Sequence, residues 1–303
     1  MSLTGKTIVV TGATGFLGSH ITRALLDAGA NVRGAVRTPS NGQWLVDLGA
    51  TMIAADLGDR ESLAKAFEGA DAVVSNAALA TRKGSTWDDF VNANQLGAEN
   101  VAHAAGDAGV KRLVHVSTVA VYNPRIRHVN SEADTRSILE PSRFAWNDLT
   151  TDWRYSKSKA LGEQRVWELA SQLGIETTAI RPGPIYGSRD GGLTEKYAKA
   201  MRSSIRLAVT LRAPHVHAGD VAIAIRGALL NDASIGQSYN VTGTRVSPYE
   251  VLRTWKQITG AGPTLIPIPL PLWIDFDDSA AKRDLGFSCR GIEAGVREIV
   301  AAG

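Results

Sequence analysis

Residues 7–18, Thr-Ile-Val-Val-Thr-Gly-Ala-Thr-Gly-Phe-Leu-Gly, form a strand-like β-branched run that breaks into three glycines and leads directly into an amphipathic helix pattern. A strand, a glycine turn and a helix present backbone N–H groups and a helix N-terminus to a phosphate. Gly12 suits the tight turn, Gly15 lets the backbone approach a ligand, and Gly18 lets the helix pack close to the strand. The stretch indicates a phosphate-binding turn, with a ligand-free glycine turn as the alternative.

Composition places the chain among ordinary globular proteins. It has 303 residues, of which 44% are hydrophobic and 21% charged, and a net charge of +3 with scattered Lys and Arg. We therefore expect no nucleic-acid partner. No apolar run is long enough to span a bilayer and no signal-peptide pattern is present, so we expect no membrane partner. The single cysteine, Cys289, excludes an internal disulfide and favours a cytoplasmic location.

Short apolar segments alternate with helical windows through the first 180 residues. Strands are expected at residues 7–11, 31–36, 51–55, 72–75, 113–116 and 176–180, and helices at about 60–68, 87–108 and 151–173. This alternation predicts an α/β fold, a Rossmann-type doubly wound parallel sheet covered on both faces. Ligands of such a sheet bind at the carboxyl ends of its strands.

The alternation weakens after Arg181. A helix at about 219–230 and a strand at 238–241 indicate returns to the first domain, whereas the Pro-rich run 262–272 and the closing helices indicate a smaller unit. We predict a cofactor-binding domain of residues 1–182 plus about 216–242. A smaller C-terminal substrate-binding lobe would comprise about 183–215 plus 243–303.

Two groups of polar residues point to proton chemistry. Tyr155 and Lys159 are four apart in a predicted helix and therefore share a face. An ammonium near a phenol favours the phenolate, so Lys159 is expected to lower the pKa of Tyr155. Thr118 follows a predicted strand, where its hydroxyl would hold a substrate oxygen; a turn or capping role is the alternative.

Together these residues resemble the extended short-chain dehydrogenase/reductase family of NAD(P)-dependent epimerases and dehydratases. The landmarks are Gly12-x-x-Gly15-x-x-Gly18, Asp56-Leu57, Asn76-Ala77-Ala78, Asn94-x-x-Gly97, Ser117-Thr118-x-x-Val121-Tyr122, Tyr155-x-x-x-Lys159, Glu163, Arg181-Pro182-Gly183, Tyr239-Asn240-Val241 and Leu285-Gly286-Phe287. They span nearly the whole chain in the order of the family. The resemblance implies hydride transfer with a nicotinamide cofactor.

The resemblance also implies roles for individual positions. Thr118 matches the catalytic hydroxyl, Tyr155 the acid/base, and Lys159 the residue that binds ribose and lowers the tyrosine pKa. Tyr122 and Tyr186 join Thr118 as expected substrate contacts. The expected cofactor-binding residues are Gly12, Thr14, Gly15, Phe16, Leu17, Gly18, Arg37, Asp56, Leu57, Asn76, Ala77, Ala78, Asn94, Tyr155, Lys159, Pro182 and Ile185.

The end of the second strand bears on the choice of nicotinamide cofactor. NAD enzymes usually place a carboxylate there for the ribose 2′-hydroxyl. This strand ends Gly34-Ala35-Val36-Arg37, and an arginine suits a 2′-phosphate. We expect NADP(H), with NAD as the alternative if Arg37 only stacks on adenine.

The substrate is expected to be a small organic molecule. Many sugar-nucleotide members of the family carry Asn where this chain has Pro184, and their diphosphate-binding arginine is out of register with Arg212. These departures favour a hydroxyl/carbonyl oxidoreductase resembling the dihydroflavonol-reductase and hydroxysteroid-dehydrogenase branch. A nucleotide-sugar epimerase or dehydratase and a non-catalytic NADP(H)-sensing regulator remain alternatives.

Three further expectations concern the surroundings of the site. The connection 123–150, with Arg125, Arg127, His128, Arg143, Phe144 and Trp146, is expected to act as a lid. No His, Cys, Asp or Glu spacing suggests a metal, and no Ser-His-Asp order suggests a hydrolase. The resemblance implies a homodimer that pairs the helices at 87–108 and 151–173.

Overall fold

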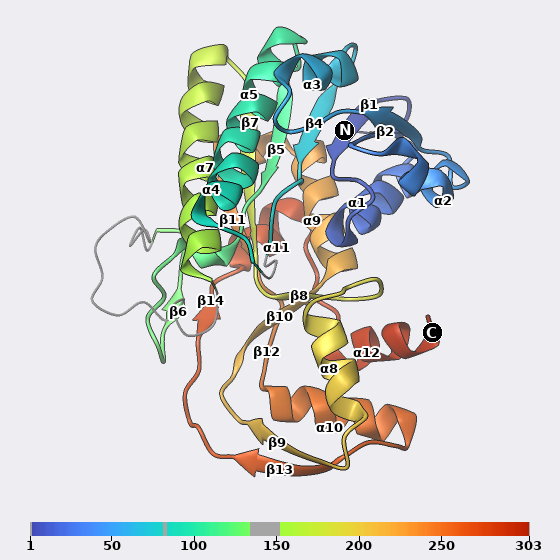
Figure 1. The fold of residues 1–303 in the computed structure, drawn as a ribbon. Coiled ribbons are helices and arrows are strands. Elements are labelled where there is room, and N and C mark those ends of the chain that lie inside the picture. The colour runs from blue at the N-terminus through green and yellow to red at the C-terminus, as the bar shows by residue number, and fades with distance from the viewer. Residues whose placement is uncertain (1, 81–83, 134–151, 303) are drawn as a thin grey trace.

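A seven-stranded parallel sheet forms the centre of the molecule, with strand order β11-β7-β5-β4-β1-β2-β3 (Figure 1). The computed structural model describes residues 2–80, 84–133 and 152–302. The strands are β1 (Thr7–Thr11), β2 (Asn31–Val36), β3 (Thr51–Ala54), β4 (Ala72–Ser75), β5 (Arg112–Val116), β7 (Glu176–Pro182) and β11 (Ser238–Val241). All six pairings between neighbours are parallel. The predicted doubly wound fold is confirmed, and the sixth predicted strand extends two residues further, to Pro182.

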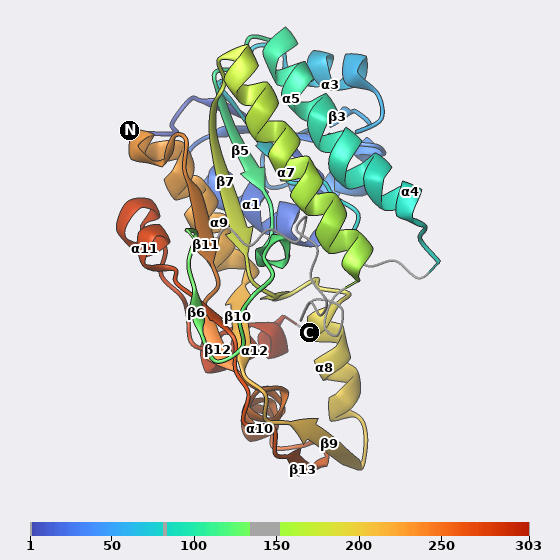
Figure 2. The same ribbon diagram turned by 90° about the vertical axis from the view of Figure 1, so that its left-hand side faces the viewer.

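Helices cover both faces of this sheet (Figures 1 and 2). One layer contains α1 (Phe16–Asp27), α9 (Ala218–Leu230) and α11 (Ser279–Leu285), and the other α3 (Arg60–Phe67), α5 (Gly97–Asp107) and α7 (Trp153–Leu173). Successive residues of a strand face opposite sides. Ile8 and Val10 accordingly pack in the cluster of α1 and α9, whereas Val9 packs in the cluster of α3, α5 and α7.

The helix predicted at 87–108 is interrupted. It consists of α4 (Trp87–Phe90), a π-helical turn η2 (Val91–Leu96) and α5. Asn94 lies in that turn, and its carboxamide bonds to the backbone N–H and C=O of Leu79, at 2.7 and 2.9 Å, and to Ser158 Oγ at 3.0 Å. A Cβ on Gly162 would lie 2.2 Å from the Asn94 carbonyl oxygen, so glycine lets α7 pack directly on the turn.

The remaining elements lie beyond the carboxyl ends of the main strands (Figure 2). They include a three-stranded sheet of β8 (Ile185–Tyr186), β10 (Ala213–His217) and β12 (Thr244–Val246), and two-stranded parallel pairs of β9 (Ile205–Val209) with β13 (Thr264–Ile268) and β6 (Val129–Asn130) with β14 (Asp275–Phe276). The helices α8 (Leu193–Met201), α10 (Pro248–Thr259) and α12 (Ile292–Ala301) share a separate apolar cluster. Short helical segments are η1 (Pro39–Gly42), α2 (Gln43–Val46), η3 (Val119–Val121) and η4 (Asp232–Ser234). Among the described helices none is long and apolar enough to cross a membrane.

Candidate active site

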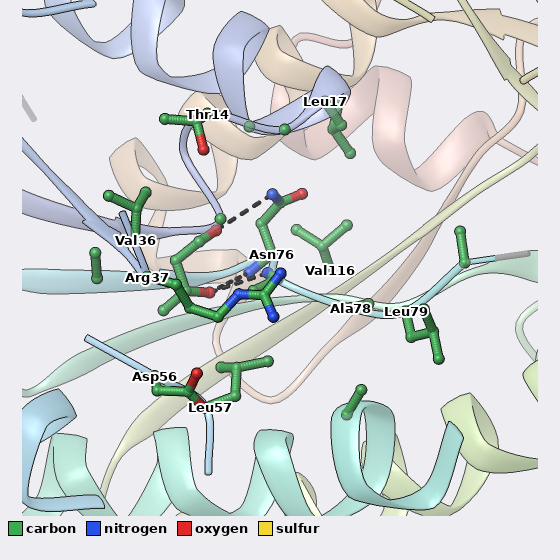
Figure 3. Close-up of a pocket in the computed structure, with 18 of the residues that line it drawn as sticks. Thr14, Leu17, Val36, Arg37, Asp56, Leu57, Asn76, Ala78, Leu79 and Val116 are labelled. Atoms are coloured by element: carbon green, nitrogen blue, oxygen red, sulfur yellow. Dashed lines mark hydrogen bonds between the residues drawn. The ribbon is translucent and has the colours of Figure 1, made fainter. Parts of the chain in front are cut away.

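A cavity of about 750 Å³ opens at the carboxyl ends of β1, β2, β4 and β5 (Figure 3). It extends from the glycine loop, past the ends of β2 and β3, to Tyr155 and Lys159 on α7. Of the predicted cofactor residues it is lined by Gly12, Thr14, Gly15, Phe16, Leu17, Gly18, Arg37, Asp56, Leu57, Asn76, Ala77, Ala78, Tyr155, Lys159 and Ile185. The sequence therefore predicted most of the wall.

The glycine loop is shaped by close backbone contacts. Gly12 has φ +66°, and a Cβ there would lie 3.0 Å from Ala77 Cα. A Cβ on Gly18 would lie 2.1 Å from the Gly12 carbonyl oxygen, so only glycine allows α1 to start so close to β1. No side chain caps α1 and its first turn holds no acidic residue. Its N–H groups thus face the cavity as the pyrophosphate of a dinucleotide requires.

Among the described residues that line the cavity near β2 and β3, Arg37 is the cation. Arg37 is exposed and makes no ion pair with a described residue, whereas Arg33 donates to the Glu68 carbonyl oxygen at 2.6 Å. Asp56 Oδ1 accepts from the Gly58 N–H at 2.7 Å. Figure 3 shows Arg37 at this end with Val36, Asp56 and Leu57. A negatively charged group on a bound ribose would therefore meet the Arg37 guanidinium at this end of the cavity.

Thr11 joins the loop after β4 to the glycine turn. Its Oγ1 accepts from the backbone N–H groups of Asn76 and Ala77, both at 3.0 Å, and Asn76 Nδ2 donates to the Thr11 carbonyl oxygen at 3.3 Å (Figure 3). These bonds hold together two loops that both line the cavity. The sequence analysis did not identify Thr11, although its hydroxyl at a strand end next to the glycines is a signal that could have been used.

At the other end, the Thr118 side chain lies close enough to Tyr155 to act on the pKa of its phenol. Thr118 Oγ1 also accepts from the Ala120 N–H at 3.2 Å and so caps η3. Lys159 Nζ donates to the Val116 carbonyl oxygen at 2.8 Å. The three predicted catalytic residues are therefore brought together by β5 and α7, and the alternative capping role of Thr118 is present as well.

Burial controls the ionisation of these groups. It lowers the pKa of Lys159 to about 8, opposed by the charge of Glu163. It raises the pKa of Tyr155, and the nearby Thr118 side chain opposes this rise. In this structure desolvation of the phenol dominates and the Lys159 ammonium is directed at Val116, so the lowering of the Tyr155 pKa by Lys159 stays a prediction.

Known proteins are similar to this chain in sequence over most of its length. The model of the NAD dependent epimerase/dehydratase family matches residues 8–242. The chain belongs to this family. It is 32% identical over 235 residues to cinnamoyl-CoA reductase 1 of Petunia hybrida, which covers 74% of this chain and 68% of that one. It is an NAD(P)-dependent oxidoreductase.

Solved structures share the fold. The yeast methylglyoxal/isovaleraldehyde reductase Gre2, complexed with NADPH, superimposes with a TM-score of 0.79 at 18% identity and covers 97% of each chain. The UDP-glucuronic acid 4-epimerase of Bacillus cereus, in complex with NAD, gives 0.78 at 23% identity, covering 97% of this chain and 96% of that one. This oxidoreductase therefore has the fold of proteins solved with either nicotinamide cofactor.

Four predicted residues of the oxidoreductase lie elsewhere than expected. Tyr122 is buried; its Oη donates to Asn240 Oδ1 at 3.0 Å and accepts from Arg181 at 2.5 Å. Tyr186 is buried against the rings and backbone of the smaller sheet, with His217 5.3 Å away between centroids. Neither lines the cavity and both are engaged elsewhere, so we withdraw both as substrate contacts; Thr118 does not line it either, but it lies beside Tyr155, which does. Asn94 and Pro182 do not line it either. The Asn94 carboxamide instead forms the hydrogen bonds to Leu79 and Ser158 described above.

The network around Tyr122 centres on a buried ion pair. Glu163 on α7 pairs with Arg181 on β7, whose side chains are 6% and 15% exposed. The guanidinium holds the pKa of Glu163 below its usual range, and the carboxylate raises the pKa of Arg181 against the effect of burial. The sequence analysis named both residues only as landmarks; the structure shows that they fasten α7, and hence Tyr155, to the sheet.

Sequence reasoning missed one wall of the cavity. Ser85, Asp89 and Asn92, from the loop before α4 and the turns that follow, line it beside Leu79 and Ala80. Of the predicted lid, Arg127 bonds the Pro271 carbonyl oxygen at 3.1 Å, whereas residues 134–151, which include Arg143, Phe144 and Trp146, lie outside the described residues. The described part of the chain holds no group of three His, Cys, Asp or Glu that suits a metal.

Proposed function

We propose that this oxidoreductase uses NADP(H) to reduce a carbonyl group of a small organic substrate to a hydroxyl, with Thr118, Tyr155 and Lys159 as its catalytic residues. The observation that carries the proposal is that Tyr155 and Lys159 line the same end of the cavity, with the Thr118 hydroxyl close to Tyr155. Two neighbouring hydroxyls could hold and protonate one substrate oxygen.

The protonation states favour reduction. With its pKa raised by burial, Tyr155 is a neutral phenol near pH 7 and has a proton to donate to a carbonyl oxygen. Thr118 orients that phenol and offers its own hydroxyl to the substrate. Lys159 is mainly cationic at neutral pH and favours the phenolate that remains after proton donation. The bound nicotinamide supplies the hydride.

The preference for NADP(H) rests on Arg37. It is the exposed guanidinium at the end of β2, and neither its neighbours on β2 nor Thr38 offers a carboxylate to a ribose 2′-hydroxyl. A planar fork of N–H donors is suited to a 2′-phosphate. Kinetics with both cofactors tests the assignment: we expect a higher kcat/KM for NADPH, and a clear preference for NADH would contradict it.

Two residues argue against a sugar-nucleotide substrate. Arg212 pairs with Glu250 on the exposed surface and does not line the cavity. Pro184 has no amide side chain, and its carbonyl oxygen accepts from the Val216 N–H at 3.0 Å. An epimerase would return the hydride to its product, so reduced-nicotinamide absorbance would stay constant during turnover. A panel of ketones, sterols and sugar nucleotides followed by that absorbance separates the two functions.

Tyr155→Phe tests the mechanism. Removing one hydroxyl should lower kcat by about 10²- to 10⁴-fold, as expected for loss of a general acid, and leave the NADPH Kd within about twofold. Tyr249→Phe, in α10 outside the cavity, is the matched control and should retain full activity. Retention of most activity by Tyr155→Phe would show that another group donates the proton. A wild type that binds NADPH but turns over none of the substrate panel would instead favour a non-catalytic NADP(H)-sensing role.

Three broader expectations remain part of this proposal. The division into a cofactor domain of residues 1–182 plus about 216–242 and a smaller lobe is retained, as is a cytoplasmic location. A homodimer would pair α5 and α7 with their copies. Sedimentation velocity that shows only monomer at micromolar concentration would remove the dimer from the proposal.

A further inference from the structure

The pair of strands β9 and β13 presents an apolar face to solvent. In their parallel register Leu207 is opposite Ile266, and Val209 is opposite Ile268. Alternate residues share a face, so Ile205 joins Leu207 and the two isoleucines of β13. These four side chains are 40–60% exposed, whereas Ala208, on the opposite face, is buried against α8 and α10. A cluster of exposed aliphatic side chains of this kind marks an interaction surface.

The same region is strongly basic. We define the basic tip as residues 193–212 and 248–268, which comprise α8, β9, α10 and β13. It holds seven basic residues, Lys196, Lys199, Arg202, Arg206, Arg212, Arg253 and Lys256, and only Glu195 and Glu250 as acidic ones. Its net charge of +5 exceeds the +3 of the whole chain, so the remainder is slightly acidic. The charge that looks scattered along the sequence is concentrated at one end of the fold.

Two of these cations flank the first apolar residue of β9 in the sequence and are exposed. Arg202 follows the last residue of α8, and Arg206 lies within β9, where alternation places it on the face opposite to Leu207. Within the described residues neither forms an ion pair, whereas Lys199 pairs with Glu195 and Arg212 with Glu250. Figures 1 and 2 both place β9 and β13 at the extremity of the molecule farthest from the seven-stranded sheet. The exposed face is therefore accessible to a large flat surface.

Charge decides which occupant fits. Two copies meeting through this face would bring two +5 tips together, and like charges at close range oppose association. The apolar face is aliphatic, without the exposed Trp or Tyr anchors of a typical protein interface. Aliphatic side chains bordered by arginines are the pattern of surfaces that rest in the headgroup layer of an anionic bilayer.

We propose that the basic tip docks this protein on the surface of anionic lipid bilayers. Ile205, Leu207, Ile266 and Ile268 enter the boundary between headgroups and acyl chains. Arg202, and Arg206 by extending its long side chain around the edge of β9, contact lipid phosphates. Within the described residues the outer edges of β9 and β13 have no partner strand, so the N–H and C=O groups along those edges restrict the strands to the hydrated headgroup layer. This inference is independent of the proposed reaction, and it replaces the sequence-based expectation of no membrane partner.

Vesicle co-sedimentation of the full chain tests the proposal. Wild type should bind phosphatidylcholine vesicles that contain phosphatidylserine, bind pure phosphatidylcholine vesicles much more weakly, and dissociate at high salt. Arg202→Gln/Arg206→Gln should lower the partition coefficient by about thirty-fold, because each basic group near an anionic surface contributes about 1 kcal/mol, or about a fivefold factor. Leu207→Ser/Ile266→Ser should lower it by at least about tenfold through loss of apolar contact.

Matched controls lie on the main-sheet side of the molecule. Arg23→Gln/Lys111→Gln removes two exposed cations, and Leu48→Ser/Leu173→Ser removes two exposed leucines, outside the basic tip. Both should bind as wild type does, and thermal unfolding confirms that all four variants are folded. The proposal is overturned if wild type does not bind the anionic vesicles, or if the controls lose as much binding as the tip variants. It is also overturned if sedimentation shows self-association that only Leu207→Ser/Ile266→Ser abolishes, because the occupant is then a second copy.

Discussion

Lys159 is a buried cation whose removal should stabilise the fold while it abolishes turnover. Its side chain is only 3% exposed, and burial lowers its pKa from 10.5 to about 8. Each tenfold difference in proton affinity between the folded and unfolded states is worth about 1.4 kcal/mol. Keeping Lys159 charged in the folded protein at neutral pH therefore costs roughly 3 kcal/mol.

Lys159→Met keeps an apolar stem of similar length and removes the charge. It also removes the 2.8 Å hydrogen bond to the Val116 carbonyl oxygen, whose loss costs about 1 kcal/mol. The net gain at pH 7 is about 2 kcal/mol. For a chain of 303 residues this raises the Tm by about 3 °C.

The pH dependence gives the test its direction. Because the folded pKa lies below the unfolded one, the cost is fully present below about pH 8 and is relieved as the pH rises towards 10.5. Thermal unfolding without cofactor at about pH 7 and about pH 10 should show the advantage of Lys159→Met only at the lower pH. Lys157→Met, at an exposed position of the same helix, should change the Tm little at either pH. A variant less stable than wild type at pH 7, or a difference that does not change with pH, would refute the assignment of a desolvated ammonium.

Three further substitutions have defined outcomes. Arg37→Asp should raise the KM for NADPH by about 10- to 100-fold through loss of a charge-assisted contact, and should improve use of NADH. If the ratio of kcat/KM for NADPH to kcat/KM for NADH were the same in wild type and variant, the NADP(H) assignment would be contradicted. Glu163→Gln leaves the Arg181 guanidinium without its carboxylate in a site where the arginine side chain is 15% exposed, so denaturant unfolding should show a loss of about 3–5 kcal/mol above pH 5. In wild type the contribution of Glu163 is present above its usual pKa and is lost as the pH falls through the lowered folded value, and the variant should lack that dependence. Gly18→Ala places a Cβ 2.1 Å from a backbone carbonyl oxygen and should weaken NADPH binding by at least tenfold in fluorescence titration, whereas Gly291→Ala, with open space around its Cβ, should not.

Much of the architecture could be predicted because it follows from local patterns of apolar residues and glycines in the sequence. The run of residues 7–18 specified a strand, a turn and a helix, and the structure places them as β1, the glycine loop and α1. The alternation of apolar segments predicted six strands of the main sheet, and the apolar segment at 238–241 predicted the seventh. Their order also follows from general rules of doubly wound sheets.

Other features could not be predicted because they depend on contacts between distant residues. The π-helical turn at Val91–Leu96 is held by Asn94 through Leu79 and Ser158, and nothing in the local pattern separates it from an α-helix. The burial of Tyr122 and Tyr186 depends on neighbours from β7, β11 and α12, so these tyrosines look like exposed site residues in the sequence alone.

The sequence by itself determined which chemical groups the oxidoreductase has and the end of the sheet at which they meet. Spacing predicts the roles of the glycines at 12, 15 and 18 and of the Tyr155-Lys159 pair. The periodicity of strands and helices places all of them at one edge of the sheet. Only the tertiary structure decided how those groups ionise and what surrounds them. Desolvation is set by every element that packs on a side chain, so the raised pKa of Tyr155, the lowered pKa of Lys159 and the concentration of charge at the basic tip appear only once the chain is folded.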